Sequence, residues 1–375
     1  MLKSLRPIII KEFRQIRRDP TSLGMLLVLP AALIVLVGYA LNFDVKHVPL
    51  AIFDQSKSSV SRTYLEKFKH TELFDYRFDV QSYQEIEELF LRGRAKLAIV
   101  IPKVFAEDVL AGRDTRVQLL CDGSDANTGA QAIANATRIT ADYSARLITS
   151  ALIRMGKQYY LPIDFQPRVW YNPDLLSNQF LLPGLIGFIL VLTAVISTSM
   201  TVVKEKERGT MEQIMVSPLR PIDVILGKTI PYMLIGLIAA TAVLVIGYIL
   251  FDIHVKGSIL LLYAAIFTII LGSLGQGLLI STVTDSQQVA FMISVFSSLL
   301  PSFLLSGFIF PVTSMPIVLQ VLSNIAVNKF FLVVVRGVML KGVGFAAVWE
   351  QFVYMAIFAT VVLAVSTKRM QKRTL

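Results

Sequence analysis

Long runs of apolar residues constrain this chain more than any other feature. Residues 180–203 and 229–251 contain no Asp, Glu, Lys or Arg. A helix of about 20 apolar residues is long enough to cross the hydrocarbon layer of a membrane, which is about 30 Å thick. The chain as a whole is 54% hydrophobic and only 17% charged, which is too apolar for a typical soluble protein. We therefore expect both runs to be transmembrane helices.

Four further apolar runs have similar length, and they give six predicted spans in total. These runs are Leu23–Leu41, Ser258–Val283, Val289–Phe310 and Ala347–Ser366. Basic residues before the first span and after the last predict that both termini are cytoplasmic, by the positive-inside rule. The expected fold is an α-helical polytopic membrane protein with an α/β extracytoplasmic domain between the first and second helices.

The remaining sequence divides around these spans. Residues 1–20 alternate apolar and basic positions at helical spacing, which predicts an interfacial amphipathic helix. We expect the first span at 21–42, the extracytoplasmic domain at 43–177, and the other five spans within 178–375. The last part includes a cytoplasmic loop at 204–228 and an outer, re-entrant region at 311–344, which is apolar but interrupted by polar residues and proline.

The segment 43–177 alternates short β-rich runs with helical patterns, which is typical of a small α/β domain. Predicted strands are Pro49–Phe53, Phe74–Val80, Leu97–Ile101, Val117–Cys121 and Pro167–Tyr171. Predicted helices are Ser58–Lys69, Tyr83–Arg92, Val104–Ala111 and Ala126–Met155.

The formal net charge of +10 does not indicate a nucleic-acid partner. The segment 43–177 carries equal numbers of basic and acidic residues, so the whole excess lies next to the apolar runs. Positive charge at the ends of spans orients them and meets anionic lipid, which is a sufficient explanation. The single cysteine, Cys121, excludes a disulfide within the chain, and no Cys/His cluster has the spacing of metal ligands.

The charged segment between the second and third predicted spans reads KEKERGTMEQIMVSPLRPIDVILGK. Gly209 and the pair Ser217-Pro218 bracket a short helical stretch, because glycine and proline both interrupt helices. The sequence of this segment resembles the cytoplasmic loop of ABC type-2 transporter permeases, the membrane subunits of ABC exporters. Further similar motifs are Arg17-Arg18-Asp19-Pro20, Trp170-Tyr171-Asn172-Pro173, and Ser306 to Pro311, so the resemblance covers nearly the whole chain.

The resemblance implies a permease that pairs with a second, identical or related permease and docks a separate ABC ATPase subunit. It also suggests contact with a periplasmic adaptor protein and a location in a bacterial inner membrane. The loop would be the element that couples to the ATPase. Its coupling residues would be Glu205, Glu207, Arg208, Gly209, Thr210, Glu212, Ser217 and Pro218, with several charges free to meet the partner. The alternative is that these charges only solvate the loop.

No nucleotide-binding motif is present. Gly227-Lys228-Thr229 resembles the end of a phosphate-binding loop, but the first glycine of that motif would have to be at Ile222. We expect that the chain is not an enzyme and binds no cofactor directly, with ATP and Mg held by the partner ATPase.

Titratable residues inside the predicted spans are nearly absent, which argues against an ion-coupled carrier. The most polar candidates for a translocation path are Gln276, Ser302 and Ser306, and phenylalanine-rich and leucine-rich spans suit an amphipathic or hydrophobic substrate. The alternative function is a membrane-anchored sensor or envelope-assembly protein that uses the outer domain for binding. Six spans exceed what such an anchor needs.

Overall fold

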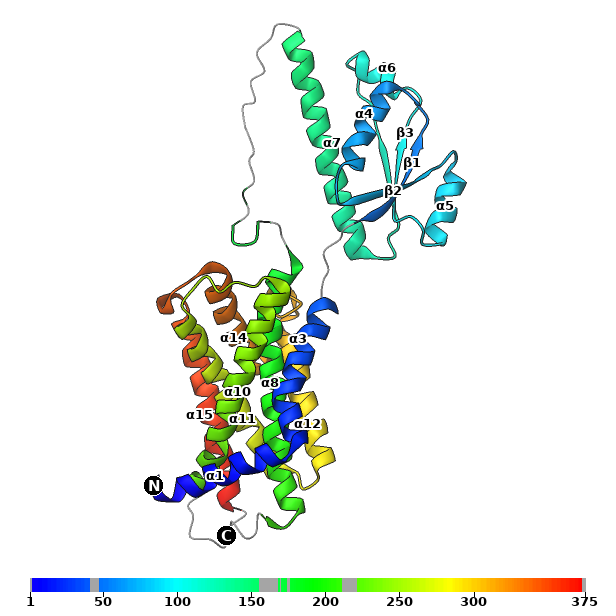
Figure 1. Cartoon of the computed structure of the whole chain (residues 1–375). Coiled ribbons are helices and arrows are strands. Elements are labelled where there is room, and N and C mark those ends of the chain that lie inside the picture. The colour runs from blue at the N-terminus through cyan, green and yellow to red at the C-terminus, as the bar shows by residue number, and fades with distance from the viewer. Residues whose placement is uncertain are drawn as a thin grey trace. The chain divides into compact units, whose positions relative to one another are not determined.

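The computed structural model describes residues 2–40, 47–154, 168, 170–173, 176–210 and 221–372. It forms two compact units (Figure 1). One unit is Asp44–Pro167, and the other joins Met1–Phe43 to Arg168–Leu375. The first is called the α/β unit below and the second the helical unit.

The α/β unit is built on a four-stranded sheet in the order β2-β1-β3-β4. Its strands are β1 (Val48–Asp54), β2 (Phe74–Asp79), β3 (Leu97–Ile101) and β4 (Gln118–Cys121). The first three strands are parallel and β4 is antiparallel to β3. Every residue of β3 is buried, so helices must cover both faces of the sheet.

Four helices provide that cover (Figure 1). Helix α5 (Tyr83–Leu91) packs on one face, where its Ile86 meets the small strand residues Ala51 and Ala98. On the other face lie α4 (Ser59–Lys69), α6 (Phe105–Leu110) and α7 (Ala126–Arg154). Successive strand residues point to opposite faces, and this alternation creates the two separate cores.

The strand and helix predictions for this unit are largely confirmed. Four strands and four helices form where the apolar periodicity predicted them, with described ends that differ by one residue at most. Met155, the predicted end of the last helix, lies outside the described residues. The predicted fifth strand, Pro167–Tyr171, is wrong where the structure describes it, because Arg168, Trp170 and Tyr171 are not in a strand. Residues 167 and 169 lie outside the described residues.

The helical unit contains five described helices that are long and apolar enough to cross a membrane. They are α8 (Ser177–Glu207), α10 (Pro221–Phe251), α11 (Ile259–Val283), α12 (Gln287–Leu300) continued by a π-helical turn (Pro301–Leu305), and α15 (Trp349–Lys372). Helix α8 is central, because every residue from 181 to 199 is buried. Helices α10, α12 and α15 instead expose many apolar side chains, as helices facing lipid do.

The first predicted span and the predicted re-entrant region are not single continuous α-helices. The first predicted span becomes α2 (Pro20–Leu23), a π-helical turn (Gly24–Val28) and α3 (Leu29–Ala40), and its apolar helix, Gly24–Ala40, is shorter than the other five. The region predicted to be re-entrant contains α13 (Ile317–Leu322), a 3-10 turn, α14 (Val327–Arg336) and a π-helical turn. Its two halves, 317–325 and 327–341, are bent by 85°. The total of six spans therefore stays a prediction.

Small residues allow the helices of this unit to pack closely. A Cβ atom at Gly277 of α11 would lie 2.7 Å from the carbonyl oxygen of Val195 in α8, closer than real side chains approach. Helix α1 (Leu2–Arg18) runs across one end of the helical unit, near the end of α15 (Figure 1). Helix α14 lies toward the opposite end, where it packs near the start of α8 and far from Glu207.

Candidate coupling site at the charged end of the helical unit

Helix α1 carries an acidic residue on its buried face. Leu5, Ile9 and Ile16 follow each other at helical spacing, and Glu12 falls on the same stripe. Glu12 is completely buried and Ile16 nearly so. The stripe packs on α10, where Gly227 lets Ile8 approach closely because a side chain there would collide with it. A carboxylate in this position needs a buried cation.

Lys228 of α10 is that cation. Its Nζ lies 3.0 Å from Glu12 Oε1 and 2.6 Å from Glu205 Oε2, and all three side chains are at most 4% exposed. Lys11 pairs with both carboxylates from the surface side, at 3.1 Å from Glu12. Lys11, Glu12, Glu205 and Lys228 are called the ion cluster below. Its two lysines balance its two glutamates.

The electrostatics of the ion cluster favour its charged form. Burial lowers the pKa of Lys11, but the Glu12 and Glu205 carboxylates outweigh burial and raise that pKa above its ordinary value. Glu12 Oε2 is buried and has no hydrogen-bond partner among the described residues. One oxygen of the cluster is therefore left without a donor from this part of the chain.

Four consecutive residues at the end of α8 each contact a different part of the unit. Lys204 Nζ lies 2.5 Å from Asp19 Oδ2, just after α1. Glu205 joins α1 to α10 through the ion cluster. Lys206 donates to the carbonyl oxygens of Ser281 and Thr284 at the end of α11. The Glu207 carboxylate accepts from the backbone N–H of Gln287, 2.7 Å away, at the start of α12. The end of α8 thereby ties together four neighbours.

The residues after this end face solvent. Arg208, Gly209 and Thr210 are exposed, and Gly209 has a φ of +68°, a conformation that favours glycine. A cavity of about 440 Å³ opens here between α1 and α8. Its lining is mostly charged and comprises Lys11, Gln15, Arg18, Asp19, Lys204, Glu205, Arg208 and Thr210.

The structure corrects one part of the predicted coupling surface. Glu205 is 3% exposed and fully engaged in the ion cluster, so it is not free to meet a partner. Glu207 is exposed but holds the start of α12. Arg208, Gly209 and Thr210 remain at the surface. Glu212, Ser217 and Pro218 lie outside the described residues.

The sequence reasoning missed Lys11, Glu12 and Lys228 as members of this site. A signal for Glu12 was present, since it is the only acidic residue of α1 and lies on the apolar stripe. A signal for Lys228 was weaker, because a lysine at the edge of an apolar run is normally placed at the membrane surface.

The predicted path residues lie in helix contacts. Ser306 Oγ donates to the carbonyl oxygen of Ser302, at 2.5 Å, and Asn328 Nδ2 lies 3.4 Å from the same oxygen. Gln276 of α11 is farther along the unit and donates to Ser297 of α12. The structure thus brings together Ser302 and Ser306 but not Gln276. Within the described ranges, no three His, Cys, Asp or Glu residues converge as metal ligands would.

Comparisons with known proteins cover nearly the entire chain. A family model described as an ABC-2 family transporter protein matches residues 20–368. The chain is 30% identical to the probable multidrug ABC transporter permease YbhS of Escherichia coli, over 91% of this chain and 89% of that protein. It is also 30% identical to the probable multidrug ABC transporter permease YbhR of the same organism, over 93% of both chains. It is 24% identical to the E. coli inner membrane transport permease YhhJ over 99% of this chain and 98% of that protein.

Proposed function

Because the chain belongs to the ABC-2 family of transporter proteins, we propose that it is the permease subunit of an ABC exporter. Membrane subunits of this family are generally not catalytic, and the ATPase would be a separate subunit. The helical unit would form the translocation path, and a second permease, identical or related, would complete it. ATP and Mg would be held by the ATPase alone.

The observation that carries this proposal is the junction at the end of α8. A machine powered by a partner must deliver movement from the docking surface to several helices at once. Lys204 to Glu207 bind the neighbours of α8 directly before the exposed residues Arg208 to Thr210. A partner that pushes on this surface would therefore move α1, α8, α10, α11 and α12 together. An anchor for a sensor domain has no need of such a junction.

The proposed orientation rests on charge. Basic side chains dominate the exposed surface of α1 and the last turns of α15, which supports a cytoplasmic location for this end by the positive-inside rule. Both termini would then be cytoplasmic and the α/β unit would be periplasmic, where it could meet an adaptor protein. The membrane would be the bacterial inner membrane, in agreement with the name of the relative YhhJ.

The cargo would be amphipathic or hydrophobic. Two relatives are named as probable multidrug permeases, and the described spans are built of apolar side chains with serines at their contacts. Ser302, Ser306 and Gln276 would lie near the path and offer hydrogen bonds to polar groups of the cargo.

The coupling surface gives the test. Arg208 is exposed and its side chain makes no hydrogen bond or ion pair with the described residues, so its reversal should leave the fold intact. We expect that the double variant Arg208→Glu/Glu212→Lys inserts and melts normally but loses copurification with its ATPase and ATP-dependent export. The physical reason is that juxtaposed like charges cost several kcal/mol at an interface.

The matched control is Lys368→Glu, a charge reversal at an exposed position near the end of α15. It should bind the ATPase and transport like the natural protein. If the double variant also binds and transports at the natural rate, the surface after α8 is not the coupling site. If the natural protein copurifies with no ATPase at all, the proposed function itself is wrong.

A further inference from the structure

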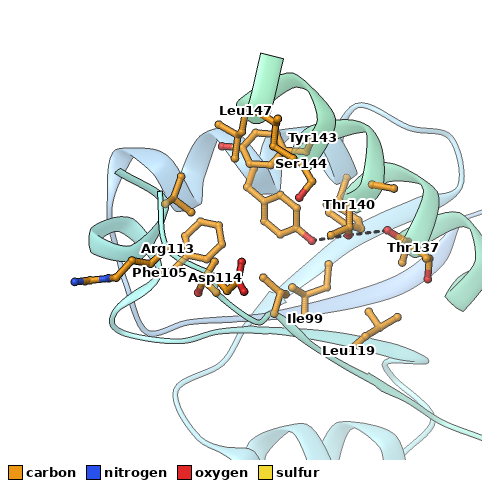
Figure 2. Close-up of a pocket in the computed structure, with 18 of the residues that line it drawn as sticks. Ile99, Phe105, Arg113, Asp114, Leu119, Thr137, Thr140, Tyr143, Ser144 and Leu147 are labelled. Carbon is orange, nitrogen blue, oxygen red and sulfur yellow. Dashed lines mark hydrogen bonds between the residues drawn. The ribbon is translucent and has the colours of Figure 1, made fainter. Parts of the chain in front are cut away.

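The α/β unit contains a cavity that the transport function does not explain. Its volume is about 590 Å³, within the range of about 300 to 1,000 Å³ that is common for small-molecule sites. The sheet and α6 form its floor with Ile99, Leu119 and Phe105, and α7 forms one wall (Figure 2). All of these residues belong to one compact unit.

Three aromatic rings gather in this cavity. The ring of Tyr64 lies 5.8 Å from that of Phe105 and 5.1 Å from that of Tyr143. The Tyr64 hydroxyl is fixed by the Thr140 hydroxyl, 2.8 Å away. Burial raises the pKa of both tyrosines, so both phenols stay neutral at physiological pH. Tyr143 is half-buried and offers the cavity a ring face with a negative electrostatic potential, whereas Tyr64 and Phe105 are only 2% and 3% exposed and pack in the core behind it.

The rim of the cavity has an acidic character. Gly112, with a φ of +67°, reverses the chain after α6 and sends residues 113–117 along the rim. Arg113 is tied to Asp108, at 2.8 Å, and its guanidinium extends away from the rings (Figure 2). Asp114 lines the cavity, is exposed, and forms no ion pair with any residue that the structure describes. The uncompensated charge at the mouth is therefore negative.

We propose that this cavity is a binding site for a small amphipathic cation, with its apolar body against the Tyr143 ring and the apolar lining and its positive charge near Asp114. Aromatic faces attract organic cations, and a nearby carboxylate adds to that attraction. The hydroxyls of Thr137 and Ser144 at the wall suit the polar edges of such a molecule. A neutral molecule would use the rings but not Asp114, and an anion would be repelled. The site does not depend on the proposed transport function.

The test uses the full chain in lipid nanodiscs without an ATPase. The probe is tritiated tetraphenylphosphonium, measured by scintillation proximity, and empty nanodiscs correct for partition into lipid. We expect saturable binding at one probe per chain. Asp114→Lys should raise the Kd about fivefold or more, because it replaces an attraction by a repulsion. Glu107→Lys makes the same change at an exposed position that does not line the cavity, and it should leave the Kd unchanged.

Two variants fill the cavity. Ser144 and Ala151 both line it from exposed positions on α7, so Ser144→Trp and Ala151→Trp should block the site without disturbing the core. Each should abolish probe binding. Neutral triphenylphosphine oxide should compete weakly, and equally in the natural chain and in Asp114→Lys.

Three results would overturn the proposal. One is binding that survives both tryptophan variants, since the probe would then lie elsewhere. Another is an equal loss in Asp114→Lys and Glu107→Lys, which would mean a general charge effect. The last is the absence of saturable binding in the natural chain.

Discussion

Lys228 is the residue whose loss should damage the helical unit most. Its ammonium group neutralises Glu12 and Glu205 inside the protein, and Lys11 alone cannot replace it from the surface. We expect that Lys228→Met lowers the free energy of unfolding by about 3 to 5 kcal/mol, the usual cost of leaving a buried charge unpaired. Thermal unfolding of the purified protein and protease sensitivity of α1 measure this.

Two further variants test whether the loss of stability comes from the unpaired buried charge. Adding Glu12→Gln to Lys228→Met removes the orphaned charge and should recover part of the loss. Lys368→Met removes an exposed lysine at the same end and should change little. Equal stability of Lys228→Met and Lys368→Met would show that the ion cluster does not hold α1 in place.

Single residues also show the limits of the sequence. Glu12 could have been found from its place on an apolar stripe, but nothing in the sequence says that its partner is 216 positions away. Glu205 sits in a run of alternating charges that looks entirely solvated. Which of four adjacent charges is buried depends on where the neighbouring helices pack, and a local pattern does not contain that information.

At the level of elements, Arg336 of α14 fastens the bent pair to the rest of the helical unit. Its guanidinium donates to the carbonyl oxygens of Phe180, Gly307 and Phe308 at 3.0 to 3.2 Å, and it stacks 3.8 Å above the Phe180 ring. The Gly307 and Phe308 carbonyls are available because the chain leaves regular helix at 306–310. The planar guanidinium group of arginine can donate to all three carbonyl oxygens at once, whereas the ammonium group of a lysine cannot reproduce this planar arrangement of donors.

Arg336→Lys should therefore lower the unfolding free energy by about 1.5 to 3 kcal/mol, the range for hydrogen bonds to charged groups. Lys341→Met, at an exposed position soon after α14, is the control. Thermal melts of the two variants measure this loss. If Arg336→Lys unfolds at the same temperature as the natural protein, the planar guanidinium group is not needed.

The elements that periodicity predicted best are those whose burial is decided locally. Strands β1 to β3 alternate or are wholly apolar, and α4 and α5 each begin at a serine that caps the first turn. The bend of 85° after residue 325 and the π-helical turns were not predicted. Helix α14 packs against α8, α11 and α15, and no window of sequence reveals these contacts.

For the whole molecule, the two units differ in how they are stabilised. The α/β unit has its own cores on both faces of the sheet, so we expect residues 44–176 to fold without the spans and to melt cooperatively. An aggregating, uncooperative product would contradict this.

The same fragment should lose stability in acid. The Lys96 ammonium, 2.6 Å from Asp122, and the Ser124 amide lower the pKa of Asp122 to about 2. The ordinary value is about 3.9, so this pair stabilises the fold above that pH and its contribution is lost as pH falls toward about 2. Asp122→Asn should remove that part of the pH dependence in melts recorded from pH 6 to 2.

The junction at the end of α8 also limits how the chain can change in length. Successive residues of an α-helix point about 100° apart, so Lys204 to Glu207 together sweep most of the way around the helix axis. Replacing Lys204, Lys206 or Glu207 affects one neighbour and leaves the other contacts possible, whereas Glu205 joins α1 to α10 and its loss affects both. Inserting or deleting a single residue before Lys204 would instead turn all four side chains away from their partners together. Single substitutions of Lys204, Lys206 or Glu207 should thus be tolerated, while a one-residue change in the length of α8 should separate α1, α10, α11 and α12 in a single step.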